Sequence, residues 1–129
     1  MKERDLYQKM RREVKNTMFK RIENALEPGT PDIYFVNKNV SGWMEAKKLQ
    51  LGNKFVGEVK IPFRPAQFEW LKQHYEYGGV SVLGIISDWG IFFAINENIK
   101  KVYQRKALRD GTLVCPKNLN KFFNEELRR

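Results

Sequence analysis

Apolar side chains recur at helical spacing in four parts of the chain. A stripe at positions i, i+1, i+4 and i+8 predicts a first helix over residues 3–16, and its members are Leu6, Tyr7, Met10 and Val14. A second helix is predicted to begin at Pro65, which suits the first helical position, and to end at Gly78-Gly79. Weaker patterns predict a helix over residues 97–108 and a terminal helix over residues 118–127.

Strands are predicted between these helices by runs of β-branched and aromatic residues. The predicted strands are residues 32–36, 40–47, 80–87 and 91–96, with a short strand or extended link at 16–24 and a further strand edge at 58–61. The apolar run over 80–87 is typical of a strand buried on both faces. The element order predicts one α/β domain over residues 1–129, with a mixed central β-sheet flanked by helices. We expect a motif-bearing core at about 1–96 and a helical extension at about 97–129.

The amino-acid composition limits the classes of partner and metal site that the protein can have. The 24 Lys and Arg against 15 Asp and Glu give a net charge of +9, which favours a polyanionic partner, DNA first. One cysteine and one histidine exclude a zinc centre, so any metal must be held by carboxylates as Mg²⁺, Mn²⁺ or Ca²⁺. The start has no apolar signal segment and the longest apolar stretch is too short to span a bilayer. We therefore expect no membrane partner and a cytoplasmic protein, in the host cytoplasm if a virus encodes it.

Two carboxylates and an amine are predicted to meet on one hairpin. If strands 32–36 and 40–47 are joined by a two-residue turn at Lys38-Asn39, paired residue numbers add up to 77, which places Asp32 opposite Glu45. Strand alternation puts Lys47 on the same face as Glu45. Carboxylates this close repel each other unless a cation lies between them, and a divalent metal would supply that charge.

The Glu-x-Lys pattern by itself is weak evidence, because it occurs three times. Glu13-Val-Lys15 lies in a helical pattern, where the two side chains do not share a face. Glu58-Val-Lys60 has no simple hairpin relation to Asp32. The alternative for the 45–47 copy is an exposed strand with a surface ion pair of little energetic weight.

Glu3 projects close to the middle of the apolar stripe of the first helix. An acid on an apolar face indicates a functional position. The alternative is a residue of a frayed first turn that favours the positive end of the helix dipole.

Three segments together resemble the PD-(D/E)xK nuclease superfamily. They are Pro28-Gly-Thr-Pro-Asp-Ile33, Gly42-Trp-Met-Glu-Ala-Lys47 and Arg64-Pro-Ala-Gln-Phe-Glu-Trp-Leu71. The match is closest to the small virus-type VRR-NUC proteins and more distant to archaeal Holliday-junction resolvases, and it covers roughly residues 1–88. It implies a restriction-endonuclease-like fold and a metal-dependent DNA phosphodiesterase, often a homodimer acting on branched DNA.

The resemblance also implies roles for single residues. Asp32, Glu45 and the main-chain carbonyl of Ala46 would bind the metal, and Lys47 would orient the attacking water. Glu3 matches a metal-proximal glutamate of the resolvase branch, with Glu23 as its competitor. Gln67 matches a glutamine on the helix after the motif, so we expect it to belong to the catalytic residues; its alternative role is capping that helix.

We therefore expect a Mg²⁺- or Mn²⁺-dependent endonuclease, structure-selective in the manner of a Holliday-junction resolvase. The alternatives are a noncatalytic DNA-binding protein that retains the fold, a flap or nicking nuclease, and a module that uses its charge on membranes or proteins. The expected phosphate contacts are Arg4, Arg11, Lys20, Arg21 and Arg64. One member of each pair Phe92-Phe93 and Phe122-Phe123 is expected to be poorly buried in a monomer, which favours a homodimer.

Overall fold

A mixed five-stranded sheet forms the framework of the computed structural model, which describes residues 1–23, 27–49, 62–103 and 112–128. The strands lie in chain order: β1 (Met18–Arg21), β2 (Ile33–Val36), β3 (Ser41–Leu49), β4 (Val80–Ser87) and β5 (Gly90–Ile95). Only the β3–β4 pair is parallel among these strands, and the other pairs are antiparallel. The predicted mixed sheet is confirmed, and β4 is buried on both faces as its apolar run predicted.

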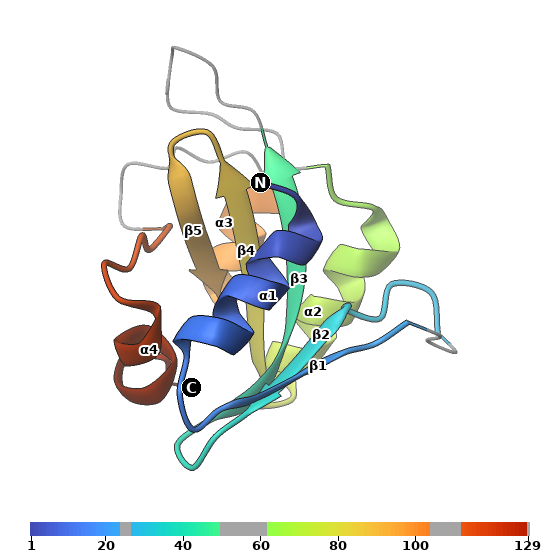
Figure 1. Cartoon of the computed structure of the whole chain (residues 1–129). Coiled ribbons are helices and arrows are strands. Elements are labelled where there is room, and N and C mark those ends of the chain that lie inside the picture. Colours follow the sequence, from blue (N-terminus) through green and yellow to red (C-terminus); the bar gives the residue numbers. More distant parts are fainter. Residues whose placement is uncertain (24–26, 50–61, 104–111, 129) are drawn as a thin grey trace.

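Helices cover both faces of this sheet (Figure 1). On one face lies α1 (Glu3–Glu13), and on the other lie α2 (Pro65–Glu76) and α3 (Glu97–Tyr103). The parallel connection from β3 to β4 passes through α2, because a crossover is needed to bring the chain back to the same edge. Within the described residues, no helix is long and apolar enough to cross a membrane.

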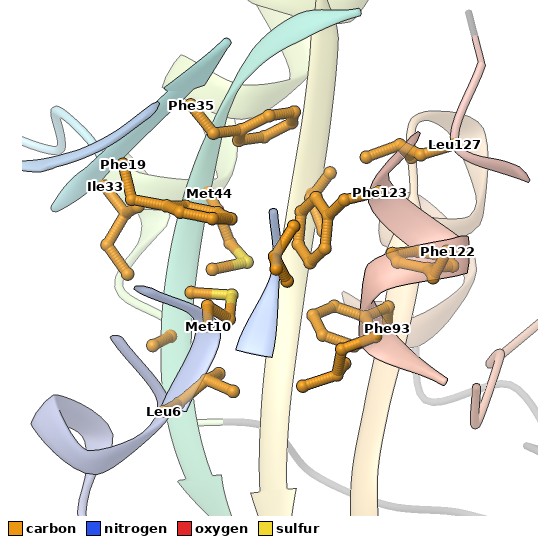
Figure 2. Close-up of a cluster of buried hydrophobic side chains, with 14 of the residues drawn as sticks. Leu6, Met10, Phe19, Ile33, Phe35, Met44, Phe93, Phe122, Phe123 and Leu127 are labelled. Carbon is orange, nitrogen blue, oxygen red and sulfur yellow. The ribbon is translucent and has the colours of Figure 1, made fainter. Parts of the chain in front are cut away.

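Strand alternation divides the apolar side chains into two cores. The first lies under α1 and contains even-numbered residues of β3 and β4 such as Met44 and Val82, together with Phe35 and Phe93 (Figure 2). The second lies under α2 and α3 and contains Leu83 and other odd-numbered residues of β4. Side chains at odd positions of β3 therefore face α2.

Several boundaries differ from those predicted. The first helix ends at Glu13 instead of residue 16, because Val14 is extended and Asn16 has a φ of 54°. Strand β3 continues to Leu49, two residues beyond its predicted end. Strand β5 ends at Ile95, since Asn96 has a φ of 52° and breaks the extended backbone. The predicted strand edge at 58–61 and the end of the predicted helix 97–108 lie outside the described residues.

The terminal helix is shorter and wider than predicted. A single helical turn, α4 (Leu119–Lys121), continues as the π-helical segment η1 (Phe122–Glu126). Both Phe122 and Phe123 are fully buried in the first core, so the expectation of one exposed ring in this pair is wrong (Figure 2). The predicted straight helix puts adjacent residues about 100° apart, whereas the wide turn directs both rings inward. In the other pair Phe93 is buried and Phe92 is half-buried.

Side-chain amides hold this terminal segment against the rest of the domain. Asn37 donates to the Phe123 carbonyl oxygen at 3.0 Å, and Asn39 donates to the Asn124 carbonyl oxygen at 2.6 Å. The segment also supplies Leu127 to the first core. Residues 119–127 are therefore packed into the same core as the motif-bearing strands.

Candidate active site

The hairpin of β2 and β3 has the predicted register. Ile33 pairs with Met44, and the turn closes with a 2.9 Å hydrogen bond from the Asn37 amide to the Val40 carbonyl oxygen. The Asn37 side chain also accepts from the Val40 amide at 3.0 Å, which fixes the two-residue turn. Continued by one residue, this register sets Asp32 opposite Glu45, as the sequence predicted.

Strand β3 extends beyond the end of β2, so one edge of β3 is unpaired there among the described strands. Its last residue paired with β2 is Met44, whereas its pairing with β4 continues to Leu49. Main-chain groups of alternate residues point to the same side, and the Val40 carbonyl points to β2. The Ala46 carbonyl therefore points to the β2 side too, beyond the last β2 pair. Among the described residues, no strand pairs with this part of β3 on that side.

Glu45 is a buried carboxyl group whose side chain is 5% exposed. The pKa of Glu45 is raised from 4.5 to about 8, first by burial and then by the charge of the nearby Asp32 carboxyl and a hydrogen bond with it. The ammonium of Lys47 opposes this shift, and the charge of Glu3 adds to it. The other three residues singled out in the sequence thus all act electrostatically on Glu45.

Asp32 has a buried oxygen without a protein partner. Its Oδ1 has no hydrogen-bond partner among the described residues, although the side chain as a whole is only half-buried. Its main-chain carbonyl is used in the sheet, since it accepts from the Ile22 amide at 2.8 Å. A buried carboxylate oxygen without a donor is costly, so this atom fits a cation ligand better than a purely structural role.

Glu3 reaches this edge of the sheet from the first turn of α1. Its Oε1 accepts a hydrogen bond from the main-chain amide of Lys48 at 3.3 Å, and the amino terminus lies beside the end of β3 (Figure 1). Glu23 is exposed and is not among the groups that shift the pKa of Glu45. Of the two competing glutamates, the geometry favours Glu3. The Lys48 amide was missed in the sequence, because a main-chain contact leaves no residue-type signal.

The Pro-Gly turn before Asp32 packs against the start of α2. Gly29 has a φ of +86°, and a Cβ there would lie 2.3 Å from the Ala66 carbonyl oxygen. Only glycine fits this approach. Gln67 is buried, and its Oε1 accepts from the Arg64 amide at 3.1 Å, which is the capping interaction considered as its alternative role.

The competing triplets do not form a second site in the described structure. Glu13 ends α1 and pairs with Lys9 at 2.7 Å, four residues earlier on the same helix. The Glu58-Val-Lys60 triplet lies outside the described residues. The 45–47 copy is therefore the one that the described fold brings together with Asp32.

The five expected phosphate contacts are all exposed. Arg4 and Arg11 lie on α1, Lys20 and Arg21 on β1, and Arg64 precedes α2. Lys20 pairs with Tyr34 in the sheet and thus lies on the face that carries Asp32, whereas Arg21 pairs with Ile33 and lies on the opposite face. The Arg11 guanidinium lies 5.7 Å from the Tyr7 ring centre.

The donor set fits a hard divalent cation that retains water ligands. No three His, Cys, Asp or Glu side chains in the described ranges gather closely enough to enclose a metal ion. Mg²⁺ is usually held in proteins by one or two carboxylates and keeps several waters. Asp32, Glu45 and the Ala46 carbonyl would supply the protein ligands of such an ion.

Comparison with solved structures finds several chains of similar fold. No family model matches the chain, and no curated protein matches its sequence at a significant level. Its fold is similar to that of Hjc from Archaeoglobus fulgidus, a Holliday junction resolvase from an archaeal hyperthermophile. The TM-score is 0.50 at 19% identity, and the match covers 70% of this chain and 71% of that chain.

The chain has a restriction-endonuclease-like fold. The similarity concerns the single small domain, with its mixed five-stranded sheet and flanking helices. This is the fold that the resemblance in the sequence implied.

Proposed function

We propose that this protein is a metal-dependent DNA endonuclease, structure-selective in the manner of a Holliday-junction resolvase, with its active site at Asp32, Glu45 and Lys47. The observation that carries the proposal is the buried Glu45 facing Asp32, with the Lys47 ammonium on the same face of β3. A buried carboxyl group facing a second one is costly to stability, and such a cost is typical of a functional site. The fold supports the same assignment.

The residues of the candidate active site would have different roles in phosphodiester hydrolysis. Asp32, Glu45 and the Ala46 carbonyl would hold a Mg²⁺ or Mn²⁺ ion, and Glu3 would add negative charge beside them. Such an ion, when bound, would neutralise a phosphate oxygen and lower the pKa of a water molecule. Lys47 orients the attacking water and stabilises developing negative charge, because a lysine ammonium donates hydrogen bonds and is a poor base. Gln67 positions the start of α2 next to the Pro-Asp turn.

The basic surface supplies affinity for the DNA backbone. Arg4, Arg11, Lys20, Arg21 and Arg64 would contact phosphates, which carry no sequence information. Shape would then select the substrate. A four-way junction has two symmetric strands to cut, so this function also calls for a homodimer with two active sites.

Cleavage of a four-way junction beside a linear duplex of the same sequence tests this function. We expect Mg²⁺-dependent paired incisions confined to the junction. Equal cutting of both substrates would contradict the structure selectivity. No cleavage of either substrate in Mg²⁺ or Mn²⁺ would contradict the endonuclease function and leave a DNA-binding protein with a nuclease fold.

A further inference from the structure

Four aromatic rings form a continuous row across the sheet face that carries the candidate active site. The ring centres of Tyr34 and Trp43 lie 5.3 Å apart with the planes 19° from parallel. Trp43 lies 5.5 Å from Trp70, and Trp70 lies 5.3 Å from His74 with an angle of 28°. The rings come from β2, β3 and α2, and all four are half-buried. We call these four residues the aromatic row.

One end of the aromatic row adjoins the catalytic carboxylates. Tyr34 pairs with Trp43 across the β2–β3 ladder, two residues along each strand from Asp32 and Glu45. Two residues along a strand is about 7 Å, and such residues share a face. Lys20 on β1 pairs with Tyr34 and is exposed on the same face, so a cationic side chain lies beside the first ring of the row.

The other end of the aromatic row opens into a cavity of about 470 Å³ at the end of α2. Its lining residues are Glu27, Trp70, Gln73, His74, Tyr77 and Gly79. Tyr77 is 91% exposed, so its ring contributes almost nothing to the core. The cavity is large enough for a small organic ligand and combines aromatic walls with polar groups.

The inner wall of the cavity is held in a fixed orientation. The Ser81 hydroxyl donates to the Leu71 carbonyl oxygen at 2.8 Å and accepts from His74 Nδ1 at 3.0 Å. Burial lowers the pKa of His74 from 6.5, which favours the neutral ring. A Cβ on Gly79 would lie 2.3 Å from the His74 ring, so glycine is needed for the ring to lie there.

We propose that the aromatic row and its cavity bind unpaired nucleotides of the DNA strand that enters the active site, an inference that rests on the proposed nuclease function. Bases stack on aromatic rings whatever their sequence, and a groove with cations and aromatic residues is typical of single-strand binding. Gln73 and Glu27 are placed to meet the polar edge of a base in the cavity. Paired bases inside a duplex cannot reach these rings. Among branched DNAs, the favoured substrates are therefore those with unpaired nucleotides beside the scissile phosphate.

Tryptophan fluorescence in EDTA tests this binding apart from cleavage. The Trp89→Phe variant leaves Trp43 and Trp70 as the only tryptophans of the three in the chain. We expect an oligothymidylate of about ten nucleotides to quench their emission, and a blunt duplex of the same length to quench it far less. In this background Tyr77→Ala should weaken oligothymidylate binding roughly tenfold and leave duplex binding unchanged, whereas Tyr77→Phe should retain the affinity.

Three results would overturn the inference. They are no quenching by the oligothymidylate, equal quenching by the duplex, and unchanged affinity in Tyr77→Ala. If Tyr77→Ala instead changes the sedimentation of the free protein without changing its affinity for the oligothymidylate, a second copy of the chain occupies this surface. Lys47→Ala should keep the quenching, so a failure of the nuclease function and a failure of this inference give different results.

Discussion

Glu45→Gln is expected to stabilise the metal-free protein at alkaline pH. In the folded protein the pKa of Glu45 is raised to about 8, so between pH 4.5 and pH 8 the folded chain keeps a proton that the unfolded chain has lost. Stability therefore falls as the pH rises through this window, by up to about 1.4 kcal/mol per pH unit. Glutamine has the same shape, remains neutral and can still hydrogen-bond Asp32.

The magnitude follows from the size of the shift. The full difference between 4.5 and about 8 corresponds to about 5 kcal/mol at 1.36 kcal/mol per pKa unit, which is an upper limit. Local rearrangement of Asp32 and Lys47 around the ionised group lowers this cost. We expect Glu45→Gln to raise the free energy of unfolding by about 2–3 kcal/mol at pH 8 and by little at pH 5.

Urea unfolding in EDTA across this pH range measures the effect. The wild-type free energy of unfolding should fall with rising pH, and the Glu45→Gln curve should be nearly flat. Glu69→Gln, an exposed change on α2, is the matched control and should follow the wild type. Parallel curves for wild type and Glu45→Gln would refute the reasoning that Glu45 is a strained, buried acid.

Three further predictions follow from the same geometry. Mn²⁺ affinity should rise by up to about tenfold per pH unit as the pH approaches 8, because binding must displace the Glu45 proton. Titration calorimetry in buffers of different ionisation heat should detect the release of that proton. An affinity that does not change with pH would place the metal elsewhere. Gly29→Ala should lower the free energy of unfolding in urea by at least about 2 kcal/mol. Gly90→Ala should lower it by less, because a Cβ there has its nearest neighbour at 3.8 Å. Equal losses of unfolding free energy in the two variants would mean that the close contact with Ala66 is not needed. Phe123→Ala should cost about 3–5 kcal/mol of unfolding free energy, whereas a loss under about 1 kcal/mol would indicate an exposed ring after all.

Local rules were enough to predict the site hairpin. A two-residue turn fixes the register of an antiparallel pair, and period-2 alternation then determines which residues share a face. For this reason, counting along the hairpin register was enough to predict that Asp32, Glu45 and Lys47 share one face. The helix that begins at Pro65 and ends before Gly78-Gly79 was equally predictable, because its start and stop signals are local.

Features that depend on tertiary packing could not be predicted. One of them is the burial of Glu45, which lies on the face of β3 that α2 covers, and α2 is distant from it in sequence. The π-helical turn at Phe122 is stabilised by the side-chain amides of Asn37 and Asn39 from the β2–β3 turn, which donate to its main-chain carbonyls, and nothing in the local sequence signals it. The edge of β3 at Ala46, which no strand of the described residues pairs with, follows from the early end of β2, and element boundaries are poorly specified by sequence.

Single-turnover cleavage of a four-way DNA junction in Mg²⁺, with wild type, Lys47→Ala and Lys48→Ala compared, tests the central claim most directly. Lys48 is the exposed neighbour on the opposite face of β3, and its variant keeps the main-chain amide that binds Glu3. We predict a loss of at least about 100-fold in rate for Lys47→Ala, unchanged DNA affinity in EDTA, and a near wild-type rate for Lys48→Ala. Cleavage by Lys47→Ala at the wild-type rate would contradict the assignment of the active site.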